Sequence, residues 1–95
     1  MEVIYERCCG LDVHKDIIQA CILKGVADEE PEVIQKEFKT LQGDLYRLCS
    51  WLQENECYHV AMESTGVYWR SVYEAIEEHL KNAQCIMVVN AYHMR

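Results

Sequence analysis

The chain is 95 residues long, with 51% hydrophobic and 26% charged residues and a formal net charge of −7 at pH 7. This composition is typical of one folded globular domain and excludes a disordered chain. No apolar run reaches the roughly 18 residues that span a bilayer, and the first residues lack the basic segment of a secretory signal. We therefore expect a cytoplasmic protein with no membrane partner. Because no basic stripe appears, charge by itself argues against DNA binding by this chain alone.

Three extended segments come first along the chain. Residues 7–13 and 17–23 are rich in apolar and β-branched residues, and only residues 14–16 separate them. A connection this short predicts an antiparallel hairpin. Residues 32–39 then alternate apolar and polar side chains, which predicts a half-exposed strand near a sheet edge.

A helix, a strand and a further strand are predicted in the middle and at the end of the chain. Leucines recur at helical spacing over residues 41–53, and Thr40 stands where an N-cap is expected. Residues 57–64 predict a fourth strand. Residues 84–90 form a continuous apolar run, which predicts a strand buried on both faces.

A second helix lies between these last two strands and ends near residue 81. The residues Ser-Thr-Gly at 64–66 supply N-cap chemistry and a tight turn, so we interpret Ser64 and Thr65 as structural and not as nucleophiles. Trp69 and Tyr73 could stack on bases, but they share a helical face with apolar residues. Core packing is therefore the preferred interpretation.

The predicted element order is βββαβαβ. A strand–helix–strand crossover makes the fourth and fifth strands parallel, with a right-handed connection. Three antiparallel strands followed by such crossovers predict an α/β, ribonuclease-H-like fold. Its five-stranded mixed sheet would have the order 3-2-1-4-5, with the second strand antiparallel.

Two carboxylates fall on neighbouring strands of this predicted sheet. Asp12 lies within the first strand, and Glu63 lies at the carboxyl end of the fourth, where open α/β sheets place their ligand sites. Facing carboxylates repel each other unless a proton or a cation intervenes, and their oxygen atoms suit Mg²⁺. Two such ions about 3.5–4 Å apart can hold the attacking and leaving oxygens of a phosphodiester displacement.

His14 and Lys15 follow Asp12 closely in the sequence. They could contact the phosphate backbone of a nucleic acid, since lysine is a common phosphate ligand. A hairpin that simply faces solvent explains the same two residues equally well.

The six cysteines include no Cys-x-x-Cys pair. In a cytoplasmic protein such residues are usually reduced and act as small buried hydrophobes. A zinc site built from Cys57, His59 and either Cys8 or Cys9 lacks the usual ligand spacing. We therefore expect no bound zinc.

Three motifs are more specific than the spacing of the two acids. The segments GLDVHKD (10–16), AMESTGVYWR (61–70) and VVNAYHMR (88–95) resemble the N-terminal domain of the DEDD-type insertion-sequence transposases. These are RuvC-like recombinases, some of which are guided by a bridge RNA. The resemblance covers about residues 9–95 and keeps the order and spacing of the motifs.

The resemblance implies a ribonuclease-H-like fold, a Mg²⁺ or Mn²⁺ cofactor, and DNA strand cleavage and joining during transposition. Asp12 and Glu63 match the first two acids of the family's tetrad. Implied partners are the DNA of the element ends and target, and a guide RNA. We also expect the chain to self-associate, because an apolar part of the sheet would be left uncovered.

The family's last motif continues into a Lys-x-Asp-x-x-Asp segment that supplies the other two acids, and a C-terminal domain then carries a nucleophilic serine. This chain reaches neither feature before Arg95. We therefore expect residues 1–95 to be the N-terminal part of a RuvC-like catalytic domain. The complete transposase would be an enzyme, whereas the isolated chain would be inactive, without the full set of metal ligands.

Two alternatives stand beside this interpretation. An actin- or sugar-kinase-like ATPase half would need glycine and serine or threonine after the aspartate, and residues 13–15 do not supply them. A non-catalytic ribonuclease-H-like module that self-associates through an apolar surface would suit the acidic charge and the missing acids.

Overall fold

The computed structural model describes residues 5–26, 30–64, 66–83 and 85–90. Its elements are β1 (Tyr5–Val13), β2 (Ile17–Val26), β3 (Glu32–Lys39), α1 (Gln42–Glu54), β4 (His59–Ser64), α2 (Trp69–His79) and β5 (Cys85–Asn90). The predicted order βββαβαβ is confirmed. Within the described residues, neither helix has the length and apolar character that crossing a membrane requires.

The strands form one five-stranded sheet in the order β3-β2-β1-β4-β5. β2 runs antiparallel to both β1 and β3, whereas β4 is parallel to β1 and to β5. The hairpin turn brings β2 beside β1, and each strand–helix–strand crossover adds a parallel strand on the other side. The predicted ribonuclease-H-like mixed sheet is therefore confirmed.

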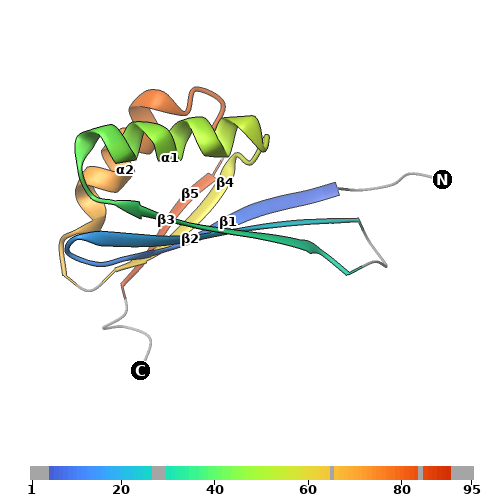
Figure 1. The fold of residues 1–95 in the computed structure, drawn as a ribbon, viewed down its shortest axis with the longest axis horizontal. Helices are drawn as coiled ribbons and strands as arrows, with labels where there is room; N and C mark the ends of the chain where they lie inside the picture. The colour runs from blue at the N-terminus through green and yellow to red at the C-terminus, as the bar shows by residue number, and fades with distance from the viewer. Residues whose placement is uncertain (1–4, 27–29, 65, 84, 91–95) are drawn as a thin grey trace.

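Both helices lie on the same face of the sheet (Figure 1). Every second residue of the central strands points toward them and is buried: Cys9, Leu11, Val13, Ile18, Ala20, Ile22, Val60 and Met62. This alternation follows from the two-residue period of a strand. α1 adds Leu48 and Leu52 to the core, and Trp51 packs on Phe38 of β3 with ring centroids 5.5 Å apart.

α2 packs with the face that its sequence predicts. Val72 and Ile76 are fully buried, and Trp69 and Tyr73 are partly buried against the same core. The two aromatic rings meet edge to face, with centroids 5.9 Å apart, a favoured geometry for aromatic pairs. The expectation that these rings serve packing is confirmed.

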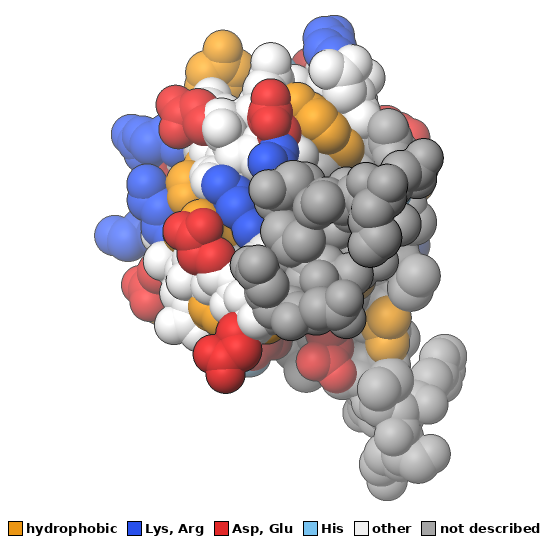
Figure 2. All heavy atoms as spheres, turned by 90° about the vertical axis from the view of Figure 1, so that its right-hand side faces the viewer, with side chains coloured by type: hydrophobic (Ala, Val, Ile, Leu, Met, Phe, Trp, Pro, Cys, Tyr) orange, Lys and Arg blue, Asp and Glu red, His pale blue; other side chains and the backbone are white. Residues whose placement is uncertain are grey.

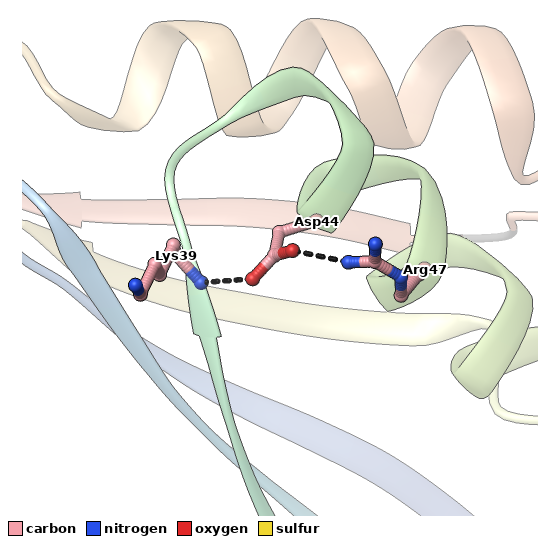
Figure 3. Close-up of polar contacts among 3 residues, drawn as sticks. All are labelled: Lys39, Asp44 and Arg47. Atoms are coloured by element: carbon pink, nitrogen blue, oxygen red, sulfur yellow. Dashed lines mark hydrogen bonds and ion pairs between the residues drawn. The ribbon is translucent and has the colours of Figure 1, made fainter.

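The start of α1 differs from the prediction that Thr40 is its N-cap. The cap position is Leu41, which makes no side-chain cap bond, while the Thr40 hydroxyl donates to the Lys15 carbonyl at 2.9 Å. Asp44, in the first turn of α1, instead ties the helix to the end of β3, because its carboxylate accepts the backbone N–H of Lys39 at 2.8 Å and pairs with Arg47 (Figure 3). Tertiary contact with the β1–β2 turn has drawn the Thr40 hydroxyl away from the helix.

The prediction that Ser64 caps α2 is also wrong. Ser64 is the last residue of β4, and it is buried on the helix-covered face, where none of the described residues hydrogen-bonds its hydroxyl. α2 begins after Tyr68, again without a side-chain cap. Gly66, at φ 79°, makes the turn between them; this left-handed conformation favours glycine. Thr65 lies outside the described residues.

β5 is less buried than its apolar run predicts. Ile86, Val88 and Val89 are each partly exposed. β5 is an edge strand, and the helices cover the sheet on one side only, so burial on both faces is not reached. Residues 91–95 of the third motif lie outside the described residues.

Five cysteines, Cys8, Cys9, Cys21, Cys49 and Cys57, are free thiols, some buried under the helices and some on the opposite face of the sheet. Cys9, Cys49 and Cys57 are buried, as expected. Burial raises the pKa of Cys9 to about 12 and that of Cys49 to about 11, so both thiols remain protonated and act as hydrophobes. Cys8 is exposed and Cys21 is half-buried, because both lie on the face that no described helix covers.

Candidate functional site

The open face of the sheet, opposite α1 and α2, carries a shallow depression of about 540 Å³. Its lining includes Gly10, Asp12, Gln19, Cys21, Ala61 and Glu63. Small residues at its centre explain the hollow: a Cβ atom added at Gly10 would meet nothing within 4 Å. The two candidate acids therefore line a cavity that is accessible from solvent.

Asp12 and Glu63 are direct partners in the parallel register of β1 and β4. Directly paired residues of neighbouring strands project on the same face, and both side chains are exposed on the open face. The structure thus brings together the two acids that the sequence predicts as neighbours. Two carboxylates in this arrangement repel each other, and a bound cation relieves that repulsion.

The pair belongs to a row of four polar residues on adjacent strands, which we call the polar row. From β3 to β4 its members are Glu37, Gln19, Asp12 and Glu63. Within it, the Gln19 side-chain amide donates to the Glu37 carboxylate at 2.9 Å.

The sequence interpretation missed Gln19 and Glu37. Gln19 could have been found from the predicted hairpin, whose register places it opposite Asp12. Glu37 could have been found from the alternation of side chains along β3, which puts it on the same face of the sheet. Both are polar residues on an exposed face of the sheet. Such residues are common on any exposed sheet, so the sequence provided no reason to select them.

His14 reaches Asp12 directly. Its Nε2 atom lies 3.2 Å from Asp12 Oδ2, and both side chains are about half exposed. Lys15 is exposed, and its backbone carbonyl oxygen accepts a hydrogen bond from the Thr40 hydroxyl. Of the two residues predicted to contact nucleic acid, His14 therefore contacts Asp12, whereas Lys15, the next residue in the chain, is exposed to solvent.

The donor atoms of the acid pair fit a hard divalent cation. Carboxylate oxygens are the usual ligands of Mg²⁺, which keeps several water molecules and needs only one or two carboxylates. Within the described ranges, no three His, Cys, Asp or Glu side chains are arranged to share a metal ion. The described residues thus offer a two-carboxylate site and not a complete protein cage.

The sequence comparison identifies the family. Residues 9–95 match the family model DEDD_Tnp_IS110, described as a transposase. The chain belongs to the IS110-type DEDD transposase family. The match spans all three motifs of this transposase domain, including the positions of Asp12 and Glu63. No curated protein sequence matches the chain.

Solved structures resemble the transposase domain in fold. A Ppx/GppA family member from Aquifex aeolicus aligns with a TM-score of 0.56 and 15% identity, over 93% of this chain and 36% of that one. An exopolyphosphatase from Cytophaga hutchinsonii ATCC 33406 aligns with a TM-score of 0.60 and 14% identity, over 92% and 35%. The domain thus spans about a third of these structures, and at such identities the likeness concerns the fold alone.

Proposed function

We propose that the chain is the N-terminal part of the catalytic domain of a metal-dependent DNA transposase, with Asp12 and Glu63 as ligands of Mg²⁺ or Mn²⁺. The observation that carries the proposal is the direct register pairing of these two residues across β1 and β4. They are the residues that match the first two acids of the family motif, and the fold sets them side by side on an accessible face.

Each described residue of the site would have a separate task. Asp12 and Glu63 hold the cation, which when bound would stabilise the charge that develops on a phosphodiester under attack. His14 orients the Asp12 carboxylate through the contact described above. Lys15, exposed beside it, would contact a phosphate as a positive point charge.

The proposed partners are the DNA of the element ends and target, a guide RNA, and a second copy of the chain. Because of the charge of this chain, we expect most contacts with DNA to come from other parts of the complete transposase. The end of the molecule on the right of Figure 1 shows acidic and basic side chains intermixed among its described residues (Figure 2). With a net charge of −7, the chain has little attraction for a phosphate backbone, so we expect no strand cleavage by the isolated chain.

The test is strand cleavage of element-end DNA by the complete transposase in Mg²⁺. We expect Asp12→Asn and Glu63→Gln each to lower the cleavage rate at least about a hundredfold, the scale reached when one preorganised electrostatic group is lost. Both changes keep the size of the side chain and remove only its charge.

Asp16→Asn is the matched control, because Asp16 is an exposed acid of the same motif that lies outside the polar row. We expect it to leave the rate within about twofold, since exposed substitutions away from a site have little effect. Full activity of Asp12→Asn, or an equal loss in Asp16→Asn, would contradict the site assignment.

A further inference from the structure

Gln19 occupies a special place beside the acid pair. It stands directly opposite Asp12 in the antiparallel register of β1 and β2 and directly opposite Glu37 in that of β2 and β3. Cβ atoms of directly opposed residues lie about 4.5–5.5 Å apart. The Gln19 side chain is therefore between two carboxylates, and it also lines the open-face depression.

The bond between Gln19 and Glu37 determines which end of the amide is available to Asp12. A carboxylate can only accept hydrogen bonds, so the Gln19 nitrogen must face Glu37; it does so at 2.9 Å. Since the nitrogen is engaged on the β3 side, the carbonyl oxygen is the amide atom left to serve the β1 side, where Asp12 is the register partner of Gln19. An amide oxygen next to the Asp12 carboxylate repels it, unless a cation or a water molecule lies between them.

We propose that the Gln19 carbonyl oxygen is a third oxygen ligand of the divalent cation held by Asp12 and Glu63, directly or through one water molecule, and that Glu37 is the positioning residue that orients it. This inference rests on the proposed function. It explains how the described residues offer a third donor although they contain no group of three acidic, histidine or cysteine ligands. Amide carbonyls are established oxygen ligands for hard cations.

Gln35 provides an internal comparison. It lies on the same face and also lines the depression, but its register partner is Cys21 and not a residue of the polar row. A glutamine at that position has no carboxylate opposite it on β2. Removing the Gln35 amide should therefore leave the metal site intact.

The experiment is a Mn²⁺ titration of the 95-residue chain, with free Mn²⁺ measured by electron paramagnetic resonance. We expect the unsubstituted chain to bind Mn²⁺ saturably and Asp12→Asn to abolish that binding. Gln19→Leu should weaken the affinity about tenfold, which is the lower end of the effect of losing a group that supports a metal site. Gln35→Leu, the matched control, should bind like the unsubstituted chain.

Two further variants separate a ligand from a merely structural side chain. Gln19→Glu restores an oxygen at the same distance and should bind Mn²⁺ at least as tightly as the unsubstituted chain, although it breaks the hydrogen bond to Glu37. Glu37→Leu keeps Gln19 but no longer orients it, and should weaken binding less than Gln19→Leu does. Thermal unfolding of each variant confirms that the fold is kept.

The outcomes distinguish this inference from the proposed function. If Gln19→Leu binds Mn²⁺ normally while Asp12→Asn does not, or if Gln19→Glu is as impaired as Gln19→Leu, Gln19 is not a ligand and the acid pair stands. If the unsubstituted chain does not bind Mn²⁺, the three-oxygen site inferred here is overturned, while the proposed function is decided separately by the cleavage assay on the complete transposase. If Asp12→Asn binds Mn²⁺ as well as the unsubstituted chain, both proposals are overturned.

Discussion

At the scale of single residues, the Asp44 carboxylate joins the end of β3 to the start of α1. One of its oxygens accepts the Lys39 backbone N–H and the other pairs with Arg47 (Figure 3). These contacts, first the backbone hydrogen bond and then Arg47, hold the pKa of Asp44 below its usual range. The negative charge also lies in the first turn of α1, where the helix dipole favours it.

We expect Asp44→Asn to destabilise the chain in a pH-dependent way. A carboxyl whose pKa is lowered by folding stabilises the folded state above its unfolded pKa, and this contribution is lost as the pH falls through the folded value. The difference in unfolding free energy between the unsubstituted chain and Asp44→Asn should therefore be largest near neutral pH and shrink on acidification. Urea denaturation at several pH values measures it.

Asp16→Asn serves as the control for this series, because Asp16 is an exposed aspartate for which the described residues supply no side-chain hydrogen bond. Its unfolding free energy should stay close to that of the unsubstituted chain. A difference for Asp44→Asn that persists unchanged into acid would show that packing of the side chain, and not its charge, is responsible.

At the scale of elements, two glycines have opposite roles in the strands and turns around the site. Gly10 is an extended residue within β1, and a Cβ atom there would meet nothing within 4 Å. Gly66 is held at φ 79° in the turn after β4. A side chain at position 10 would meet no steric obstacle, whereas a side chain at position 66 would be held in a strained backbone conformation.

We expect Gly10→Ala to stabilise the chain by about 0.4–1 kcal/mol, because alanine has less conformational entropy to lose from the unfolded state. Gly66→Ala should destabilise it by about 1–2 kcal/mol, the strain of a side chain in the left-handed region. Chemical denaturation of both variants tests the pair. Equal effects of the two changes would show that the backbone conformation at Gly66 is not what requires glycine.

At the scale of the whole molecule, the two faces of the sheet differ in kind. One face is covered by α1 and α2, whereas no described helix covers the other face (Figure 1). Beyond the polar row the open face carries an exposed apolar pair: Leu23 and Val33 are register partners on β2 and β3 and are 39% and 53% exposed. Adjacent exposed apolar residues of this kind mark interaction surfaces.

We expect the isolated chain to self-associate through this apolar part of the open face. Light scattering over a range of concentrations should give a mass above 11.2 kDa, and Leu23→Lys and Val33→Lys should return it to the monomer value. Glu30→Lys, an exposed change just before β3, is the control for added charge. A strict monomer at all concentrations would refute this prediction.

Much of the fold could be predicted from local patterns in the sequence. The period of two in the strands, the leucine spacing of α1 and the short turn at residues 14–16 determine the element order, and known rules for crossovers then give the sheet order. The same reasoning placed Asp12 and Glu63 on adjacent strands, because it depends only on which strands are neighbours.

Contacts between distant segments were decided by the tertiary structure alone. The Thr40 hydroxyl bonds the Lys15 carbonyl and not its own helix, and Ser64 extends β4 because Val13 and Asn90 pair with it. Gln19 becomes part of the site only through the register that sets it between Asp12 and Glu37. Local sequence specifies period and turn chemistry, but a polar side chain bonds whichever partner the packed sheet brings within reach.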